Sequence, residues 1–204
     1  MIVLDHFIQR FSNLFPAQAG SEPWEIVQNI SEILNQNILE LGSEYKIEDG
    51  IAVHRSAIIE PGAVLKRPVI IGKQCFVGSN AYLRGGVYLV SGVSLGPNCE
   101  VKSSLIFPNS SLGHFNFIGD SIIGNHVNFE AGSLTANHYN EREDKSIWVT
   151  FNSVSRDTGV EKFGALVGDG TKIGANSVLS PGTLLAPNTI VERLSLVEQN
   201  KKEN

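Results

Sequence analysis

The stretch VIIGKQCFVGSNAYLRGGVYLVSGVSLGPNCEV, residues 69–101, decides the fold, because an aliphatic residue recurs in it at every sixth position. The series consists of Ile71, Val77, Leu83, Leu89, Leu95 and Val101. A period of six fits neither the 3.6-residue repeat of an α-helix nor the two-residue alternation of a plain strand. It is typical of a β-helix with three short flat faces, in which each six-residue unit points one aliphatic side chain inward.

The same period extends on both sides of this stretch. It begins at Val53, shifts phase by one residue after the quoted segment, is interrupted between Thr135 and Val167, and ends at Val191. Three units make one coil, so residues 18 apart should stack along one face, with neighbouring coils about 4.8 Å apart. The sequence therefore predicts an all-β fold, a parallel β-helix over residues 51–192.

The segments outside the repeat have a different character. Within residues 1–50, the stretch PWEIVQNISEILNQNILEL (23–41) has apolar residues at helical spacing, and Pro23 suits a first helical turn. We expect a short α-helical N-terminal cap that covers the first coil and blocks its exposed sheet end. Residues 138–161 break the repeat and predict a protruding loop over the expected site, because insertions in such coils map to loops. Residues 193–204 predict a polar C-terminal tail.

Composition narrows the range of functions. The chain has 204 residues, a formal net charge of −5, 18% charged residues and 2 cysteines. A net acidic chain disfavours general nucleic-acid binding, which needs a broad basic surface. Two cysteines exclude a disulfide scaffold, and no apolar run approaches a membrane span of about 18 residues. The N-terminus lacks the pattern of a signal peptide, so we expect a cytoplasmic protein without a membrane partner.

Three basic residues follow aliphatic positions at intervals of one coil. Lys66, Arg84 and Lys102 are each 18 residues apart and should stack as a column on one face. Like charges opposed on neighbouring strands are normally unfavourable, so the column suits a bound anion such as a phosphate. A solvated face on which the charges splay apart is the alternative reading.

Histidines and cysteines give weaker signals. His114, His126 and His138 are spaced by 12 residues, two-thirds of a coil, so they should lie on different faces and no metal site is expected. Zinc-dependent carbonic anhydrases of similar fold are the metal alternative, but they have a pair of histidines five residues apart, which this sequence lacks. Cys75 and Cys99 take inward positions and are interpreted as small core residues.

The run LGHFNFIGDSIIGNHVNFEAGSLTANHYN (112–140) carries the most specific signal. It resembles the glucosamine-1-phosphate N-acetyltransferase half of the bifunctional bacterial enzyme that makes UDP-N-acetylglucosamine. The match has no gap from Leu112 to Asn137, and it continues upstream through EVKSS (100–104) and LRGG (83–86). The resemblance implies the left-handed hexapeptide-repeat form of the β-helix, a homotrimer, and acetyl-CoA as acetyl donor with no metal.

The resemblance also implies roles for residues on the acceptor side. His114 stands where the family has its general base, and a neutral imidazole can take a proton near pH 7. Arg84 and Lys102 match two cationic contacts to a sugar phosphate, so the family pattern and the column point to the same residues. Asn128 matches a sugar-contacting residue, and Lys162 matches a lysine that contacts the acceptor.

On the coenzyme side the resemblance implies a second set. Ala131 and Ala175 would line the coenzyme A channel, Asn137 would lie near the acetyl group, and Arg193 falls beside the cofactor where the family has a small residue. Phe117 takes the place of an acceptor-contacting tyrosine and removes one hydroxyl group. The nucleotide-transferring domain has no counterpart in this sequence, so uridyl transfer is not expected.

The sequence thus predicts an acetyl-CoA-dependent N-acetyltransferase acting on an amino-sugar phosphate, glucosamine-1-phosphate first, or on a nucleotide-linked amino sugar. Substitutions at Phe117, His138 and Ala175, with about one coil fewer at the coenzyme end, motivate an alternative. In that alternative the chain is a non-catalytic trimeric module or scaffold that binds sugar nucleotides.

Overall fold

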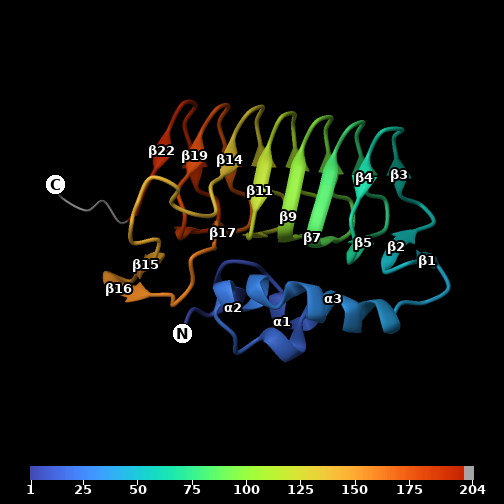
Figure 1. The fold of residues 1–204 in the computed structure, drawn as a ribbon, viewed down its shortest axis with the longest axis horizontal. Helices are drawn as coiled ribbons and strands as arrows, with labels where there is room; N and C mark the ends of the chain where they lie inside the picture. Colours follow the sequence, from blue (N-terminus) through green and yellow to red (C-terminus); the bar gives the residue numbers. More distant parts are fainter. Residues whose placement is uncertain (200–204) are drawn as a thin grey trace.

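The computed structural model describes residues 1–199 and shows a three-sided β-helix of about eight turns with short helices at its N-terminus (Figure 1). The expected left-handed parallel β-helix is therefore confirmed, as are the N-terminal helices. Within the β-helix, parallel pairing links each strand to the strand one coil away, for example Val77 to Leu95 across a spacing of 18. The inward aliphatic residues form a continuous buried core along the axis.

Three faces make up the prism, and we number them in the order in which the chain crosses them from residue 58 onward. Face 1 consists of β3 (Ile58–Ile59), β6 (Phe76–Val77), β8 (Ser94–Leu95), β10 (Ser111–Leu112), β13 (Asn128–Phe129), β18 (Lys172–Ile173) and β21 (Ile190–Val191). Face 2 consists of β4 (Val64–Leu65), the first halves of β7 (Tyr82–Leu89) and β9 (Glu100–Ile106), β11 (Phe117–Gly119), β14 (Leu134–Thr135), β19 (Val178–Leu179) and β22 (Leu196–Val197). Face 3 consists of β2 (Ile51–His54), β5 (Val69–Ile71), the second halves of β7 and β9, β12 (Ile122–Ile123), β17 (Ala165–Val167) and β20 (Thr183–Leu185).

The phase shift in the sequence corresponds to coils that are one residue shorter. Leu95 pairs with Leu112, a spacing of 17 rather than 18. The shortening is absorbed by a bulge in β7 between Arg84 and Val87. Gly85 and Gly86 form this bulge with positive φ angles of 70° and 93°, a backbone conformation that glycine adopts without steric cost.

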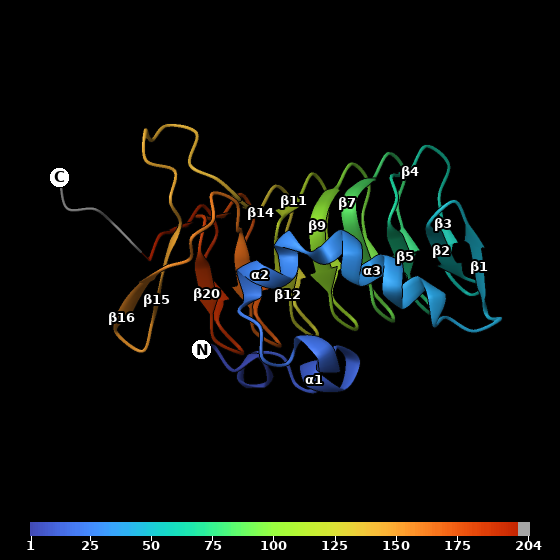
Figure 2. The same ribbon diagram turned by 60° about the horizontal axis from the view of Figure 1, so that its bottom comes forward.

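The N-terminal segment forms η1 (Leu4–His6), α1 (Phe11–Leu14), η2 (Pro16–Gln18), α2 (Pro23–Gln28) and α3 (Ile30–Leu39). These helices lie along the side of the prism and not over its first coil, which corrects the expected position of the cap (Figures 1 and 2). Helix α3 contacts β5, β7 and β9, and α2 contacts β9. The apolar side of α3 therefore covers face 3, where a whole row of strands offers more apolar area than the end of one coil.

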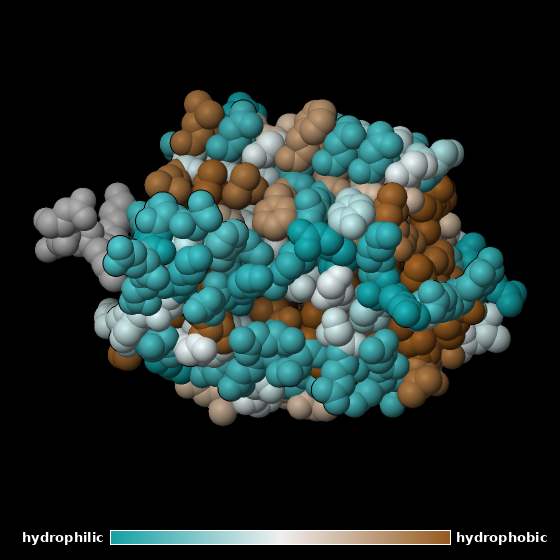
Figure 3. All heavy atoms as spheres, viewed as in Figure 1, coloured by the Kyte–Doolittle hydropathy of each residue, from teal (hydrophilic) through white to brown (hydrophobic). Residues whose placement is uncertain are grey.

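The first coil consequently keeps an open end. The inward residues Val53, Ile59 and Leu65 are only partly buried, and Figure 3 shows apolar surface at the end that carries β1–β3. Strand β1 (Tyr45–Glu48) pairs antiparallel with β2, so residues 45–48 of the expected helical segment are a strand. This strand covers the backbone edge of face 3, which would otherwise offer unpaired hydrogen-bonding groups.

The insertion expected as a loop contains a hairpin of β15 (Trp148–Phe151) and β16 (Val154–Asp157). The hairpin packs beside β20 and the N-terminal segment, while the chain ahead of it protrudes (Figure 2). Phe151 contacts Phe7 with ring centroids 5.8 Å apart, and Arg156 bonds Glu22 at 2.7 Å. The hairpin thus completes the cover of face 3 and does not stand over the expected site.

At the C-terminus, the β-helix continues to Val197, because Leu196 pairs with Val178. The expected tail therefore begins later than residue 193, and residues 200–204 lie outside the described residues. Within residues 1–199, none of the helices is long and apolar enough to cross a membrane.

Candidate functional site

Two edges of face 2 carry almost all the residues singled out by sequence. We call the edge between faces 1 and 2 the His114 corner, made of the turns 113–116, 130–133, 174–177 and 192–195. We call the edge between faces 2 and 3 the Lys102 corner, made of the turns 84–86, 102–104, 119–121 and 180–182. The length of one face-2 strand, about three residues or 10 Å, separates the two corners within one chain.

The His114 corner brings together the expected base and the expected coenzyme residues. Leu112 pairs with Phe129, Phe129 with Ile173, and Ile173 with Val191, so the residues two positions further on follow one another on successive coils. Those residues are His114, Ala131, Ala175 and Arg193. The imidazole of His114 is exposed on this ridge and free to meet a ligand.

A carboxylate clip crosses the same corner. Glu130 Oε2 accepts hydrogen bonds from the backbone N–H of Ala175 at 3.0 Å and from Arg193 Nε at 2.8 Å, and Oε1 accepts one from Arg193 Nη2 at 3.0 Å. The Arg193 guanidinium holds the pKa of the Glu130 carboxyl below its usual value, and the carboxylate in turn raises the pKa of Arg193. Sequence reasoning missed Glu130, although an acidic residue in an otherwise small and apolar turn (EAGS, 130–133) was a visible signal.

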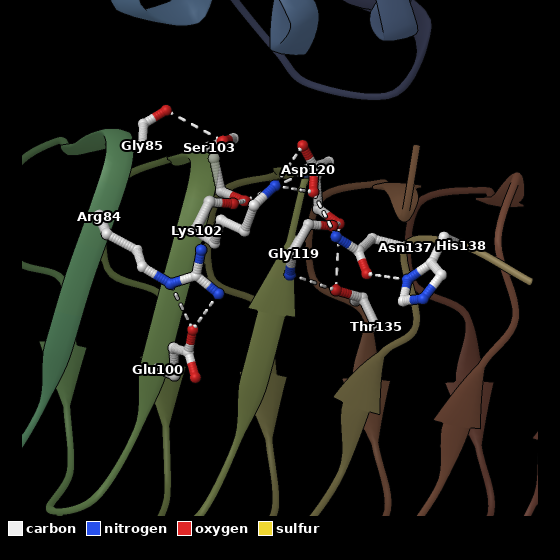
Figure 4. A network of polar contacts seen from close by, with 12 residues as sticks. Arg84, Gly85, Glu100, Lys102, Ser103, Gly119, Asp120, Thr135, Asn137 and His138 are labelled. Atoms are coloured by element: carbon white, nitrogen blue, oxygen red, sulfur yellow. Dashed lines mark hydrogen bonds and ion pairs between the residues drawn. The ribbon is translucent and has the colours of Figure 1, made fainter. Parts of the chain in front are cut away.

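The Lys102 corner contains the expected basic column, with Arg84 and Lys102 as register partners (Figure 4). Each of these cations is paired within the chain. Arg84 Nη2 lies 2.7 Å from Glu100 Oε1, and the two side chains are 40% and 36% exposed. Lys102 Nζ lies 2.8 Å and 2.6 Å from the two oxygens of Asp120, and these side chains are only 17% and 9% exposed. The third member of the column, Lys66, is exposed and has no ion pair within residues 1–199.

Asp120 organises a wider network at this corner. Its Oδ2 accepts a short hydrogen bond from Asn137 Nδ2, and Asn137 Oδ1 lies 3.2 Å from His138 Nδ1 (Figure 4). The two ends of the insertion meet here, because the Phe163 N–H donates to the Asn137 carbonyl and the Gly164 N–H donates to the Asp120 carbonyl. Lys162 is thereby brought to the Lys102 corner from the far end of the insertion.

The remaining expected residues lie on the flat faces. Phe117 is half-buried on face 2, where it pairs with Glu100 and Leu134. Asn128 is exposed on face 1 and pairs with Lys172 of the next coil. Asn137, expected beside the acetyl group, lies at the Lys102 corner and not at the corner of the coenzyme residues.

The sequence contained a signal for Asp120 that went unused. The interval of 18 that links Lys66, Arg84 and Lys102 leads next to Asp120, so the column ends in a carboxylate. Residues 1–199 contain no group of three or more His, Cys, Asp or Glu side chains placed to hold a metal ion. Cys75 and Cys99 are both buried free thiols, as the interpretation of small core residues requires.

The β-helix built from six-residue units and the motif of residues 112–140 together define a domain with the hexapeptide acyltransferase fold. Residues 47–139 match the family model described as the GMPPB C-terminal domain. The chain is similar to the C-terminal acetyltransferase region of the bifunctional protein GlmU. The GlmU of Methanococcus maripaludis strain S2 is 38% identical over 176 residues, which cover 77% of this chain and 41% of that protein.

A second relative, the bifunctional GlmU of Methanocaldococcus jannaschii, is 35% identical over 159 residues, 74% of this chain and 38% of that protein. The chain thus spans about two fifths of the length of these relatives. Among solved structures, PerB from Caulobacter crescentus in complex with CoA and GDP-perosamine has a TM-score of 0.35 and 13% identity, over 69% of this chain and 50% of that chain. A putative acetyltransferase from Bacillus cereus has a TM-score of 0.40 and 14% identity, over 71% and 74%.

Proposed function

We propose that this protein is an acetyl-CoA-dependent N-acetyltransferase whose acceptor is an amino-sugar phosphate of the glucosamine-1-phosphate type or a nucleotide-linked amino sugar. The observation that carries the proposal is the register of the His114 corner. His114, Ala131, Ala175 and Arg193 were selected by motif, over nearly 80 residues of sequence, and they follow one another on consecutive coils. A base directly beside a channel for the acyl donor is what acyl transfer requires.

In the proposed reaction, His114 takes a proton from the acceptor amine as the amine nitrogen attacks the thioester carbonyl carbon. The new C–N bond forms, the C–S bond breaks, and the proton passes to the departing thiolate of coenzyme A. An exposed imidazole at the end of a turn can reach both the amine and the sulfur atom. General-base catalysis of this kind contributes about 10²- to 10⁴-fold to the rate.

The donor end of the site offers cations for a coenzyme diphosphate. A groove of about 250 Å³ beside the His114 corner is lined by Asn128, Glu130, Lys172 and Arg193, among other residues. Arg193 is 72% exposed, and Lys172 is exposed as well. The guanidinium now bonded to Glu130 is therefore able to turn toward a phosphate, for which its planar fork is suited.

We propose further that the working unit is a homotrimer. The outward residues of face 2 form a ladder that is apolar except for one carboxylate: Val64, Tyr82, Glu100, Phe117, Leu134, Val178 and Leu196. The members are partly exposed, with Val64 and Leu196 the most exposed, and an apolar stripe of this length is typical of a surface that another subunit covers. Packing against this stripe would bring the His114 corner of one subunit to the Lys102 corner of its neighbour.

The proposal is tested by measuring acetyl-CoA consumption over a panel of amino-sugar phosphates and nucleotide-linked amino sugars. Turnover with at least one acceptor is expected, and His114→Ala should lower it by about 10²- to 10⁴-fold. His114→Ala and Lys162→Ala chains, each strongly impaired at low acceptor concentration, are unfolded and refolded together in equal amounts, and about a quarter of the sites should be fully active again if each site uses both corners from different subunits. An unchanged rate in His114→Ala would reject the base, and no regained activity would reject the shared site.

The alternative, a non-catalytic trimeric module that binds sugar nucleotides, is favoured by one specific observation. The Ala175 N–H and the Arg193 guanidinium at the donor end already have an internal partner, Glu130. Calorimetry with coenzyme A separates the two functions. Saturable binding supports the transferase, whereas binding of sugar nucleotide without any coenzyme affinity supports the module.

A further inference from the structure

A groove runs between the N-terminal helices and the Lys102 corner. It has a volume of about 410 Å³, within the range of about 300–1,000 Å³ for small-molecule sites. Three segments far apart in sequence line it. Gln28 and Ser31 come from α2 and the start of α3, Ser103 comes from the corner, and Lys162 comes from the end of the insertion. Figure 4 shows Ser103 and Asp120 on the side of the corner that faces the helices.

The helical wall of this groove is held at a fixed distance from the corner. A Cβ atom at Gly86 would lie 2.7 Å from Ile30 Cγ2 and 3.2 Å from Ser31 Oγ, so only glycine allows the helix to approach this closely. Ser31 Oγ also donates a hydrogen bond of 3.4 Å to the Gly85 carbonyl. The bulge that shortens the coil therefore also seats α3, and the groove beside it is part of the folded framework.

The far wall is anchored by the aromatic core. Trp24 of α2 packs edge-on against Phe163 with ring centroids 5.9 Å apart, and both side chains are buried. Phe163 directly follows Lys162, so this contact fixes where the lysine enters the groove. The groove is thus built from helices and corner together, and neither part forms it alone.

The polar groups in the groove are those that an amino-sugar phosphate requires. The Ser31 hydroxyl and the Gln28 amide can exchange hydrogen bonds with sugar hydroxyls. Glu161 is exposed and supplies a carboxylate that can accept hydrogen bonds from the acceptor, whereas both oxygens of Asp120 are already bonded to Lys102. Lys162 is exposed and forms no ion pair with any residue of the described part of the chain, in contrast to Arg84 and Lys102. It is therefore the cation at this corner that is available to a phosphate.

We infer that this groove is the acceptor subsite of the proposed transferase and that the N-terminal helices determine which acceptor fits. In this arrangement Gln28 and Ser31 bind the sugar hydroxyls, and Lys162 binds the phosphate. Lys102 stays with Asp120 and holds that carboxylate in position. The inference rests on the proposed function for the identity of the acceptor, but the groove and its helical wall belong to the chain itself.

Calorimetry on the full chain without coenzyme tests the subsite directly, with glucosamine 1-phosphate, glucosamine and inorganic phosphate as probes. Gln28→Ala and Ser31→Ala should each weaken binding of glucosamine 1-phosphate by about 3- to 10-fold, the loss expected for one neutral hydrogen bond. Lys162→Ala should weaken it by about 10- to 100-fold and leave the affinity for glucosamine unchanged. The matched control is Gln36→Ala, which replaces an exposed glutamine of α3 outside the groove.

Steady-state kinetics give a second readout that a merely structural helix would not change. The variants Gln28→Ala and Ser31→Ala should raise the KM for the acceptor and leave the KM for acetyl-CoA at the wild-type value. Affinities equal to that of Gln36→Ala would overturn the inference, even if the enzyme transfers acetyl groups. Loss of affinity in the helix variants without any turnover would uphold the subsite and reject the transferase.

Discussion

The ion pair between Lys102 and Asp120 makes the sharpest quantitative prediction. Both oxygens of Asp120 lie within 2.8 Å of the lysine Nζ, and the side chains retain only 17% and 9% exposure. Replacing Asp120 by Asn leaves the lysine charge in place without its counter-charge. Breaking a fully buried pair in this way costs about 3–5 kcal/mol. Because Lys102 keeps some contact with water, we expect the free energy of unfolding to fall by about 2–3 kcal/mol.

For a chain of this length, such a loss corresponds to a fall in Tm of about 4–12 °C. Urea unfolding measures the loss of free energy, and it is done at one fixed protein concentration because the stability of the proposed trimer would depend on concentration. The double variant Asp120→Asn with Lys102→Met removes the orphaned charge and should recover at least about 1 kcal/mol relative to Asp120→Asn alone. An unfolding free energy of Asp120→Asn within about 0.5 kcal/mol of wild type would refute the assignment of this pair as a coupled buried contact. Strictly additive effects of Asp120→Asn and Lys102→Met in the double variant would refute it as well.

Three further predictions concern other parts of the prism. Gly96→Ala should lower the free energy of unfolding by more than about 2 kcal/mol in a urea titration, because its Cβ would collide with the Gly113 carbonyl of the next coil; a wild-type midpoint would contradict this. Burial raises the pKa of the Cys75 thiol to about 11 and also raises the pKa of Cys99, so neither should react with a thiol reagent at pH 8 until the chain is unfolded. The pKa of Glu130 is lowered from 4.5, so it stabilises the fold above that pH and the contribution is lost as pH falls through the depressed value. Glu130→Gln should therefore flatten the decrease of Tm on acidification, and an unchanged slope would argue against the clip.

The β-helix was predictable because its rule is local. Each six-residue unit needs one inward aliphatic side chain, and residues such as Val77 and Leu95 satisfy it regardless of distant sequence. The place where the phase shifts was visible too, but its cause was not. The bulge at Gly85 and Gly86 depends on how two neighbouring coils pair, and the six-residue repeat in the sequence gives no information about that pairing.

The position of the N-terminal helices was beyond sequence reasoning for a similar reason. The apolar side of α3 indicates that the helix is buried, but it does not say against which surface. The first coil and face 3 are both apolar, and face 3 offers the longer row of strands. The glycine at position 86 lets Ile30 approach face 3 closely, and this role becomes visible only once the coils are stacked.

Charge pairing explains why the candidate site was only partly predictable. The column of Arg84 and Lys102 followed from spacing, yet the partner of each lies one coil away at Glu100 and Asp120. Opposite charges between coils remove the repulsion that made a bound anion seem necessary. Lys162 is therefore the proposed phosphate contact at this corner, and its placement depends on how the insertion closes and not on the period of six.

The three faces of the prism differ in what covers them, and this difference supports the proposed trimer. The helices and the hairpin cover face 3, so this face is not available to another subunit. Face 2 keeps an apolar ladder with Glu100 as its one charged member, and the side chains expected to act in catalysis stand at its two edges. Within one chain, about 10 Å of strand separates His114 from the groove that contains Lys162. A second copy packed on face 2 would bury the apolar ladder. The same contact would bring the His114 corner of one copy next to the Lys102 corner of the other, so subunit packing would account for both the apolar surface and the divided site.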